Sequence, residues 1–256
     1  MIVNAVFAAL SKALADFWKP RILALALVPP LAAIAVWIGL VWIFSDDWAR
    51  AVTDWIANIS WLGWVRDWGL SSIFIWASGI AAVALMLPVV LITAVLVTDI
   101  VAMPVIVPFV GHRHYPRLEQ RKGGTVAGSV WNAVVAVIVF AALWLASLPL
   151  WFTGIGALVL PLLISAYFNQ RVFRYDALAE HASAEERRAV VRDAGGRLYA
   201  LGLALAALYY VPIVNLLVPV LSGLAFTHLC LGELAQLRIK EQGARSKDRG
   251  ISKDRK

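Results

Sequence analysis

The sequence predicts an all-α integral membrane protein with two long transmembrane helices, two helical hairpins that enter the bilayer only part-way, and interfacial amphipathic helices. Composition is the first observation: 61% of the 256 residues are hydrophobic, only 15% are charged, and the mean hydropathy is +0.78. A soluble domain has fewer apolar and more charged residues. The second observation is a set of uncharged segments, each longer than the about 20 residues that a helix needs to cross a bilayer: 22–45, 69–98, 125–170 and 198–232.

The chain begins with an amphipathic pattern. Residues 1–18 place apolar side chains at intervals of three and four, with polar side chains between them. This spacing predicts a helix that lies in the membrane interface rather than crossing it. The same stretch lacks a basic region followed by a small-residue cleavage site, so we expect no signal peptide. Lys19, Pro20 and Arg21 then end this helix and precede the first crossing, 22–44.

The region after the first crossing is rich in tryptophan. Segment 45–70 contains five tryptophans, and its four aspartates outnumber its two arginines. Tryptophan favours the headgroup layer, and the acidic balance predicts that the segment lies on the outer face. A second crossing is expected over 71–98. The basic loops 112–122 and 171–197 should then be cytoplasmic by the positive-inside rule.

Two apolar blocks remain, 129–173 and 198–231, and each begins and ends at a segment expected in the cytoplasm. Each block must therefore enter the membrane and return. A helix over 198–211 spans about 21 Å, which is less than the roughly 30 Å of hydrocarbon. We therefore expect hairpins that penetrate only part-way. The alternative is a pair of tilted, spanning helices that the prolines merely kink.

The charged residues predict the domain boundary and the partners. Residues 1–234 form one membrane domain, and 235–256 form a basic tail whose composition predicts disorder in the cytoplasm. The formal net charge of +7 comes from segments that orient a membrane protein and attract anionic lipid. We therefore expect membrane lipids as partners and no nucleic acid.

The main candidate site lies at the tip of the second hairpin, at Pro212, Asn215 and Pro219. Non-helical backbone deep in a bilayer must be buried in protein or line a wet cavity. Its unpaired amides and carbonyls, together with the Asn215 side chain, are candidate ligands for a small ion or solute. Asn215 could equally cap the second arm of the hairpin.

Two arginines are the candidate cations of an anion path. Arg21 could hold an anion by its charge and forked donors, or it could be a snorkelling boundary residue. Arg197 opens the second hairpin and could pair with Asp176, Glu180 or a lipid phosphate; the sequence does not choose among them.

Asp99 and His228 are secondary candidates. An acid close to an apolar membrane segment is a functional candidate, but Asp99 could also cap the next helix. His228 lies among apolar residues, where it could titrate during transport or simply be hydrogen-bonded within the bundle. Cys230 is the only cysteine, which excludes disulfides within the chain.

Enzymatic chemistry is not expected. The apolar blocks contain almost none of the clustered carboxylates, histidines or Ser-His pairs that catalysis requires, and no Walker-type phosphate-binding motif is present. His112 and His114 lie in a basic loop without nearby acids, which is a poor setting for a metal. We therefore predict no catalytic residues, no cofactor and no metal.

Four stretches, taken in order, resemble the EI24/CysZ family of bacterial inner-membrane proteins, and the resemblance covers nearly the whole chain. They are WKPRILALALVPPL at 18–31, VTDIVAMPVIVPFV at 97–110, RYDALAEH at 174–181, and the arm beginning at Arg197 with VPIVN at 211–215 and GLAFTHL at 223–229.

The resemblance implies two long crossings, two part-way hairpins and a homo-oligomer in the bacterial inner membrane, with both termini cytoplasmic by the topology above. It also implies uptake of sulfate or a similar oxyanion that feeds cysteine synthesis. The sequence departs from the family at the glycine and arginine that bind the anion. The matching stretch here is Pro20, Arg21, Ile22 and Leu23, in which the glycine is absent and Leu23 stands in place of the arginine. Our leading hypothesis is an anion permease; the alternative is a non-transporting membrane scaffold of the same fold.

Overall fold

The protein is all-α. The computed structural model describes residues 2–57, 101–151, 153–211 and 214–253, and within these ranges every regular element is a helix. Among the residues that it describes, three helical segments are candidate membrane spans by length and composition: Pro20–Phe44, Val126–Leu150 and Val218–Ala244. The predicted class, an all-α membrane protein, is confirmed.

The chain divides into two compact units, one of Met1–Leu25 with Ile100–Lys256 and one of Ala26–Asp99. The described part of the second unit is helical and belongs to α2, which runs from Pro20 to Ala57. α2 covers the predicted first crossing and continues into the tryptophan-rich segment, where Arg50 pairs with Asp47 one turn away. The predicted second crossing, 71–98, lies outside the described residues.

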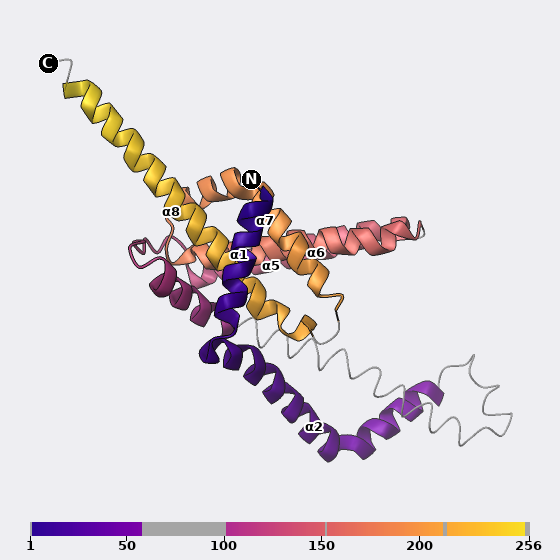
Figure 1. The fold of residues 1–256 in the computed structure, drawn as a ribbon. Helices are drawn as coiled ribbons and strands as arrows, with labels where there is room; N and C mark the ends of the chain where they lie inside the picture. Colours follow the sequence, from indigo (N-terminus) through magenta and orange to yellow (C-terminus); the bar gives the residue numbers. More distant parts are fainter. Residues whose placement is uncertain (1, 58–100, 152, 212–213, 254–256) are drawn as a thin grey trace. The chain divides into compact units, whose positions relative to one another are not determined.

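In the first unit, α1 (Ile2–Phe17) packs across the last helix of the chain (Figure 1). Its inner face carries small residues, Ala9 and Ala13, together with Asp16 and Phe17. Small side chains let helix backbones approach closely. Its outer face exposes large apolar side chains such as Phe7, which is 72% exposed. The predicted helix is present, and its exposed face carries the polar residues Asn4, Ser11 and Lys12 as well as large apolar side chains. Its place in the membrane interface remains a prediction.

Helices α5 (Val126–Trp151) and α6 (Ile155–Ala179) pack side by side as an antiparallel pair (Figure 1). Gly154 lies in the turn between them and takes a positive φ of 73° that favours glycine. The Thr153 hydroxyl donates to the Leu150 carbonyl and accepts from the Gly156 amide. The tip thus satisfies part of its own backbone without any charge.

Helix α7 (Ala184–Leu208) begins with a reciprocal cap. The Ser183 hydroxyl accepts from the Glu186 amide, while the Glu186 carboxylate accepts from the Ser183 amide. This capping box satisfies two orphan donors of the first turn. α7 then packs closely on α6 at Gly202, where an added Cβ would lie 2.5 Å from the Ala166 carbonyl oxygen.

Helix α8 (Val218–Lys253) follows a short 3₁₀ turn, η2 (Val214–Leu216), and forms the centre of the first unit. Every residue from 218 to 231 is buried. α1, α6 and α7 all pack on it. Gly223 also sits against Met103 and Ile106 of the helix over 101–114. A helix that is apolar on all sides must be enclosed, and here protein encloses it.

The structure differs from the predicted disorder of residues 235–256. α8 continues through this segment to Lys253 (Figure 1). The segment is rich in Ala, Glu, Gln, Lys and Arg, which are good helix formers. Arg238 is also fixed by ion pairs and hydrogen bonds to other elements, so the helix has tertiary support beyond the apolar block. Charge content alone was a poor guide to disorder here.

Candidate functional site

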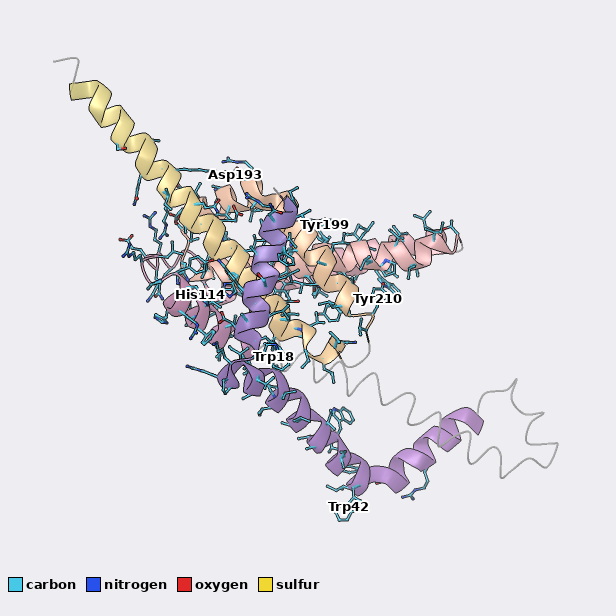
Figure 2. The ribbon with its side chains drawn as sticks, in the orientation of Figure 1. Trp18, Trp42, His114, Asp193, Tyr199 and Tyr210 are labelled. Atoms are coloured by element: carbon cyan, nitrogen blue, oxygen red, sulfur yellow. The ribbon has the colours of Figure 1, made fainter. Side chains whose placement is uncertain are left out.

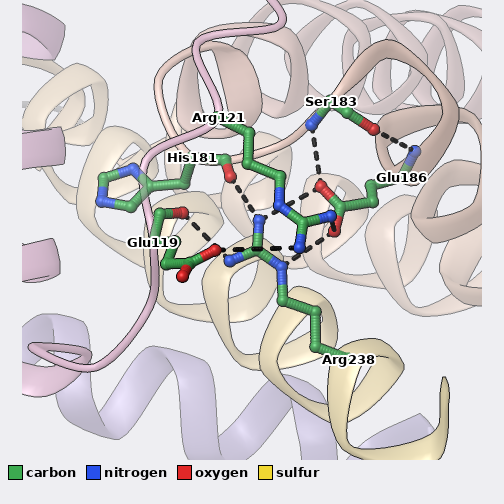
Figure 3. A network of polar contacts seen from close by, with 6 residues as sticks. All are labelled: Glu119, Arg121, His181, Ser183, Glu186 and Arg238. Atoms are coloured by element: carbon green, nitrogen blue, oxygen red, sulfur yellow. Dashed lines mark hydrogen bonds and ion pairs between the residues drawn. The ribbon is translucent and has the colours of Figure 1, made fainter. Parts of the chain in front are cut away.

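An arginine and glutamate network joins the loop 115–125, the start of α7 and the middle of α8 (Figure 3). The Glu186 carboxylate is nearly buried and accepts from the Arg238 Nε and from the Arg121 Nη1, both at 2.8 Å. Arg238 also donates to the backbone carbonyls of His181 at 2.7 Å and Glu119 at 3.0 Å. One carboxylate therefore holds two guanidinium groups from different elements.

Burial and charge act in opposite directions on Glu186. Burial raises the pKa of the Glu186 carboxyl, but the hydrogen bond and charge of Arg238, the Ser183 amide and the charge of Arg121 outweigh it. The pKa lies below its ordinary value of 4.5. Glu186 is thus a carboxylate near neutral pH, which matches its two cationic partners.

His181 lies beside this network, at the end of the α6–α7 turn. Its pKa is lowered from 6.5, chiefly by burial, with the Glu180 charge opposing and the Arg238 charge contributing. Its Nδ1 is buried without a hydrogen-bond partner among the described residues. The imidazole is therefore held neutral in the folded protein.

A cavity of about 200 Å³ opens next to the network, and its lining is polar. Three arginines and two glutamates contribute, so the lining has a formal charge of only +1 (3 − 2). The residues are Arg117, Glu119, Arg121, Arg238, Glu241 and Gln242. Because Arg121 and Arg238 are already held by Glu186, this region serves as a clamp between elements more than as an open anion site.

A second polar cluster is formed by Asp16 of α1, His114 of the helix over 101–114, and His228 of α8. The Asp16 Oδ2 lies 2.7 Å from the His114 Nε2 and 3.0 Å from the His228 Nε2. The two imidazole rings meet edge to face with centroids 4.7 Å apart. The Arg113 Nε lies 3.6 Å from the Asp16 Oδ1. Three elements far apart in sequence thus converge on one carboxylate, and His114 is labelled in Figure 2.

This cluster corrects the expectation that His114 has no acid nearby. Asp16 is 98 residues away along the chain, so the spacing of the loop histidines could not reveal it. The side chains of Asp16 and His228 are 3% and 0% exposed, whereas that of His114 is 30% exposed. A carboxylate oxygen and two imidazole nitrogens, which together are common ligands of a transition metal, all lie within 4.8 Å of one another.

The structure places the hairpin residues as follows. Asn215 lies half-buried in η2, and its backbone amide donates to the Val211 carbonyl at 3.1 Å. Pro219 is buried in the first turn of α8, and Pro212 lies outside the described residues. Arg197 pairs with Glu233 of α8 at 2.9 Å. Glu233 was not among the partners that the sequence suggested for Arg197.

The remaining candidates are not brought to the tip of this hairpin by any described contact. Arg21 is exposed in the first turn of α2, and Asp99 lies outside the described residues. His228 is on α8 and belongs to the Asp16 cluster. The sequence missed Arg121, Glu186 and Arg238 as a group. The Ser183 to Glu186 capping box was the one local signal that could have singled out Glu186.

Long apolar helices, an uncharged helical hairpin and polar clusters gathered at the charged segments define an all-α, multi-pass membrane protein. A family model described as Sulfate transporter CysZ/Etoposide-induced protein 2.4 (EI24) matches residues 9–219. The chain belongs to this family, a transporter-like membrane family, which confirms the resemblance found in the sequence. No curated protein and no solved structure matches the chain closely enough to count as a relative.

Proposed function

We propose that this protein is a permease for a small inorganic oxyanion, with sulfate as the expected substrate. The observation that carries the proposal is the family match over residues 9–219, whose description names a sulfate transporter. The apolar helices that can cross a bilayer support a membrane path. We place the protein in the bacterial inner membrane as a homo-oligomer with both termini in the cytoplasm. The sulfate that it takes up would feed cysteine synthesis.

The lengths of the α7–α8 arms support a hairpin that enters part-way. The uncharged part of α7, residues 198–208, spans about 16 Å, and α8 from Val218 to the first charge at Glu233 spans about 22 Å. Both are shorter than the roughly 30 Å of hydrocarbon. The tip with Asn215 would then lie inside the bilayer, where its amide and the nearby backbone require partners.

The uncharged parts of α5 and α6 differ in length. The apolar segment of α5 has 25 residues and measures about 37 Å, while the uncharged part of α6, residues 155–170, measures about 24 Å. α5 is thus long enough to cross completely and α6 is not. We retain the part-way hairpin as the proposed topology, with α5 tilted.

A topological test uses single-cysteine variants in a Cys230→Ala background. We expect Gly154→Cys and Asn215→Cys to resist an impermeant thiol reagent applied from the periplasmic side, because both tips should lie in lipid or protein. A cysteine in the segment 45–70, such as Ser60→Cys, is the positive control for outer exposure. Labelling of both tips as fast as the control would show spanning pairs and remove the proposed path.

Arg21 and Asn215 are the proposed anion contacts, and Arg197 supports them indirectly. Arg21 is exposed, and among the described residues no carboxylate forms an ion pair with it. The Arg197 guanidinium is held by Glu233, so its main contribution is to fix the two arms of the hairpin at their cytoplasmic base. An anion could be attracted by the first arginine and passed to the polar tip.

Uptake of labelled sulfate into proteoliposomes tests the proposal. We expect saturable uptake that excess unlabelled sulfate suppresses and excess chloride does not. Asn215→Leu and Arg21→Ala should each lower the initial rate about 10-fold or more, since a hydrogen bond to a charged group contributes about 1.5–3 kcal/mol. Arg192→Ala, which removes an arginine side chain that is 78% exposed, is the matched control and should keep the unaltered rate.

The alternative, a non-transporting scaffold, is favoured by one observation. Two arginines of the α7–α8 region, Arg197 and Arg238, are engaged with glutamates of the same chain. In a scaffold the polar tip would serve oligomer packing. Folded protein that shows no sulfate uptake under any imposed ion gradient or membrane potential would support the scaffold and refute the permease.

A further inference from the structure

The cluster of Asp16, His114 and His228 is not used by the proposed anion path. We infer that these three residues form a binding site for a divalent transition-metal ion of the zinc class. The inference rests on the convergence of one carboxylate and two imidazole Nε2 atoms within 4.8 Å of one another, and it is independent of the proposed transport.

Two of the three separations between ligand atoms are close to those around a bound ion. In a tetrahedral zinc site the metal lies about 2.0–2.2 Å from each nitrogen or oxygen, which places neighbouring ligand atoms about 3.3 Å apart. The Asp16 Oδ2 is already 2.7 Å from the His114 Nε2 and 3.0 Å from the His228 Nε2. A lengthening of these two contacts by a few tenths of an ångström, with the two imidazole nitrogens within 4.8 Å of one another, would admit the ion in place of the shared protons.

The donor set selects the class of metal. Two imidazoles with one carboxylate suit zinc and its first-row neighbours, whereas magnesium and calcium prefer oxygen ligands only. No thiolate belongs to the cluster, so a copper(I) or iron–sulfur centre is not indicated. Three protein ligands leave a fourth position, and it would open toward the His114 side, where the side chain is 30% exposed.

The surroundings set the strength of binding. Arg113 lies 3.6 Å from the other carboxylate oxygen, Oδ1, so it can orient Asp16 while Oδ2 binds the metal, although its charge opposes a cation. The His228 Nδ1 is buried and has no acceptor among the described residues. Metal-bound histidines usually donate this second N–H, and loss of such an outer contact costs 10–100-fold in affinity. We therefore expect weaker binding than at a fully supported structural zinc site.

A metal at this point would link the first and last helices of the chain. The two contacts of Asp16 span 98 and 212 residues of sequence. Because the ion would bind the folded arrangement and not the separated helices, it should raise the temperature of thermal unfolding. Metal supply would then set how firmly α1 is held against α8.

The test uses the full chain, purified in detergent with a tag that contains no histidine and stripped with a chelator. Cobalt(II) added to the stripped protein should give visible d–d absorption, and zinc should bind in one saturable equivalent measured against a chromophoric chelator. His114→Ala and Asp16→Asn should weaken zinc binding about 100-fold. The chain has four histidines, and His112→Ala, which removes the exposed neighbour two residues away, is the matched control.

Two results would overturn the inference. One is an unaltered chain that unfolds cooperatively on heating but binds no saturable equivalent of zinc. The other is zinc binding by His114→Ala that equals that of His112→Ala. Because His114 is partly exposed, its replacement should leave the fold intact, and cooperative unfolding of that variant in the absence of metal verifies this. Loss of sulfate uptake would not bear on either result.

Discussion

Helices α5 and α8 each contain a long apolar segment but have opposite surroundings. Both contain candidate membrane spans by length and composition, yet 11% of the apolar stretch of α5 is buried in the protein, against 89% for α8. Residues such as Trp131 and Val137 of α5 face outward, whereas all residues from 218 to 231 of α8 are enclosed. Length and hydropathy identify both as candidate spans; only tertiary packing distinguishes them.

The difference explains where polar residues are tolerated. α8 carries Ser222, Thr227 and His228 within its buried stretch. The Thr227 hydroxyl donates to the Gly223 carbonyl at 2.6 Å, and the His228 imidazole lies against Asp16. A histidine facing lipid would lack such a partner from another helix. The enclosed helix can therefore hold functional groups, and the outward-facing helix provides the apolar surface.

The largest expected effect is the loss of stability when a buried side chain of α8 is truncated, compared with the truncation of an exposed side chain of α5. Phe226→Ala should lower the free energy of unfolding by about 3–5 kcal/mol, since it leaves a cavity at a fully buried ring. The Phe226 ring stacks on Phe173 with centroids 5.8 Å apart. Val137→Ala in α5, at a side chain that is 53% exposed, should change the same quantity by less than about 0.5 kcal/mol. Denaturant titration of the two variants in one detergent measures the difference.

Equal losses in those two variants would contradict the comparison. They would mean that α5 is packed as tightly as α8, for instance against a second copy of the chain.

The next effect concerns the close contact between α6 and α7, two of the helices that pack on α8. Gly202→Ala should destabilise the protein by about 1–3 kcal/mol, because the added methyl would meet the Ala166 carbonyl and force α6 and α7 apart. Gly195→Ala in the same helix has nothing within 4 Å and should stabilise it by about 0.5–1 kcal/mol through its helix propensity. Opposite signs in thermal unfolding are the expected result; a stabilising Gly202→Ala would refute the close approach.

A smaller effect tests the clamp on the far half of α8. Glu186→Gln keeps the capping box but loses the charged contacts with Arg238 and Arg121, so we expect a loss of about 1–2 kcal/mol at neutral pH. The folded pKa of Glu186 is below the ordinary 4.5, so its contribution is complete above pH 4.5 and is lost as the pH falls through the folded value. Unfolding temperatures measured from pH 7 downward should show this acid loss in the unaltered chain and not in Glu186→Gln.

The smallest expected effect is the contribution of His181 to stability, which is also lost as the pH falls. Its folded pKa is lowered from 6.5 by burial, so its contribution is complete above pH 6.5 and is lost as the pH falls from there through the folded value. His181→Gln should flatten the upper part of the acid decline, between pH 6.5 and the onset of the Glu186 loss. A decline that begins at the same pH in this variant would show that His181 does not titrate in this way.

The sequence predicted what depends on local pattern. The spacing of apolar residues predicted the helix α1, and the uncharged block between two charged segments predicted a hairpin over 129–173, where α5 and α6 form a helical pair. The family was also apparent from ordered motifs. Each of these signals lies within a short window, so a single sequence contains it.

What the sequence could not predict depends on contacts between distant segments. Asp16 meets His114 and His228 across 98 and 212 residues, and Arg238 meets Glu186 across 52. No local spacing encodes such pairs. The same cause explains the error in the tail, because the helix past residue 235 is supported by Arg238 and its distant partners. The enclosure of α8 likewise depends on other helices, among them α1, α6 and α7.

Photolabelling from within the bilayer tests the central claim most directly. A small apolar diazirine dissolved in proteoliposomes and activated by light inserts into whatever side chains face lipid, and peptide mass mapping locates the insertion. We predict heavy labelling of 126–150 and almost none of 218–231, because lipid surrounds the first segment and protein encloses the second. Equal labelling of the two segments per residue would show that α8 also faces lipid and would contradict the account.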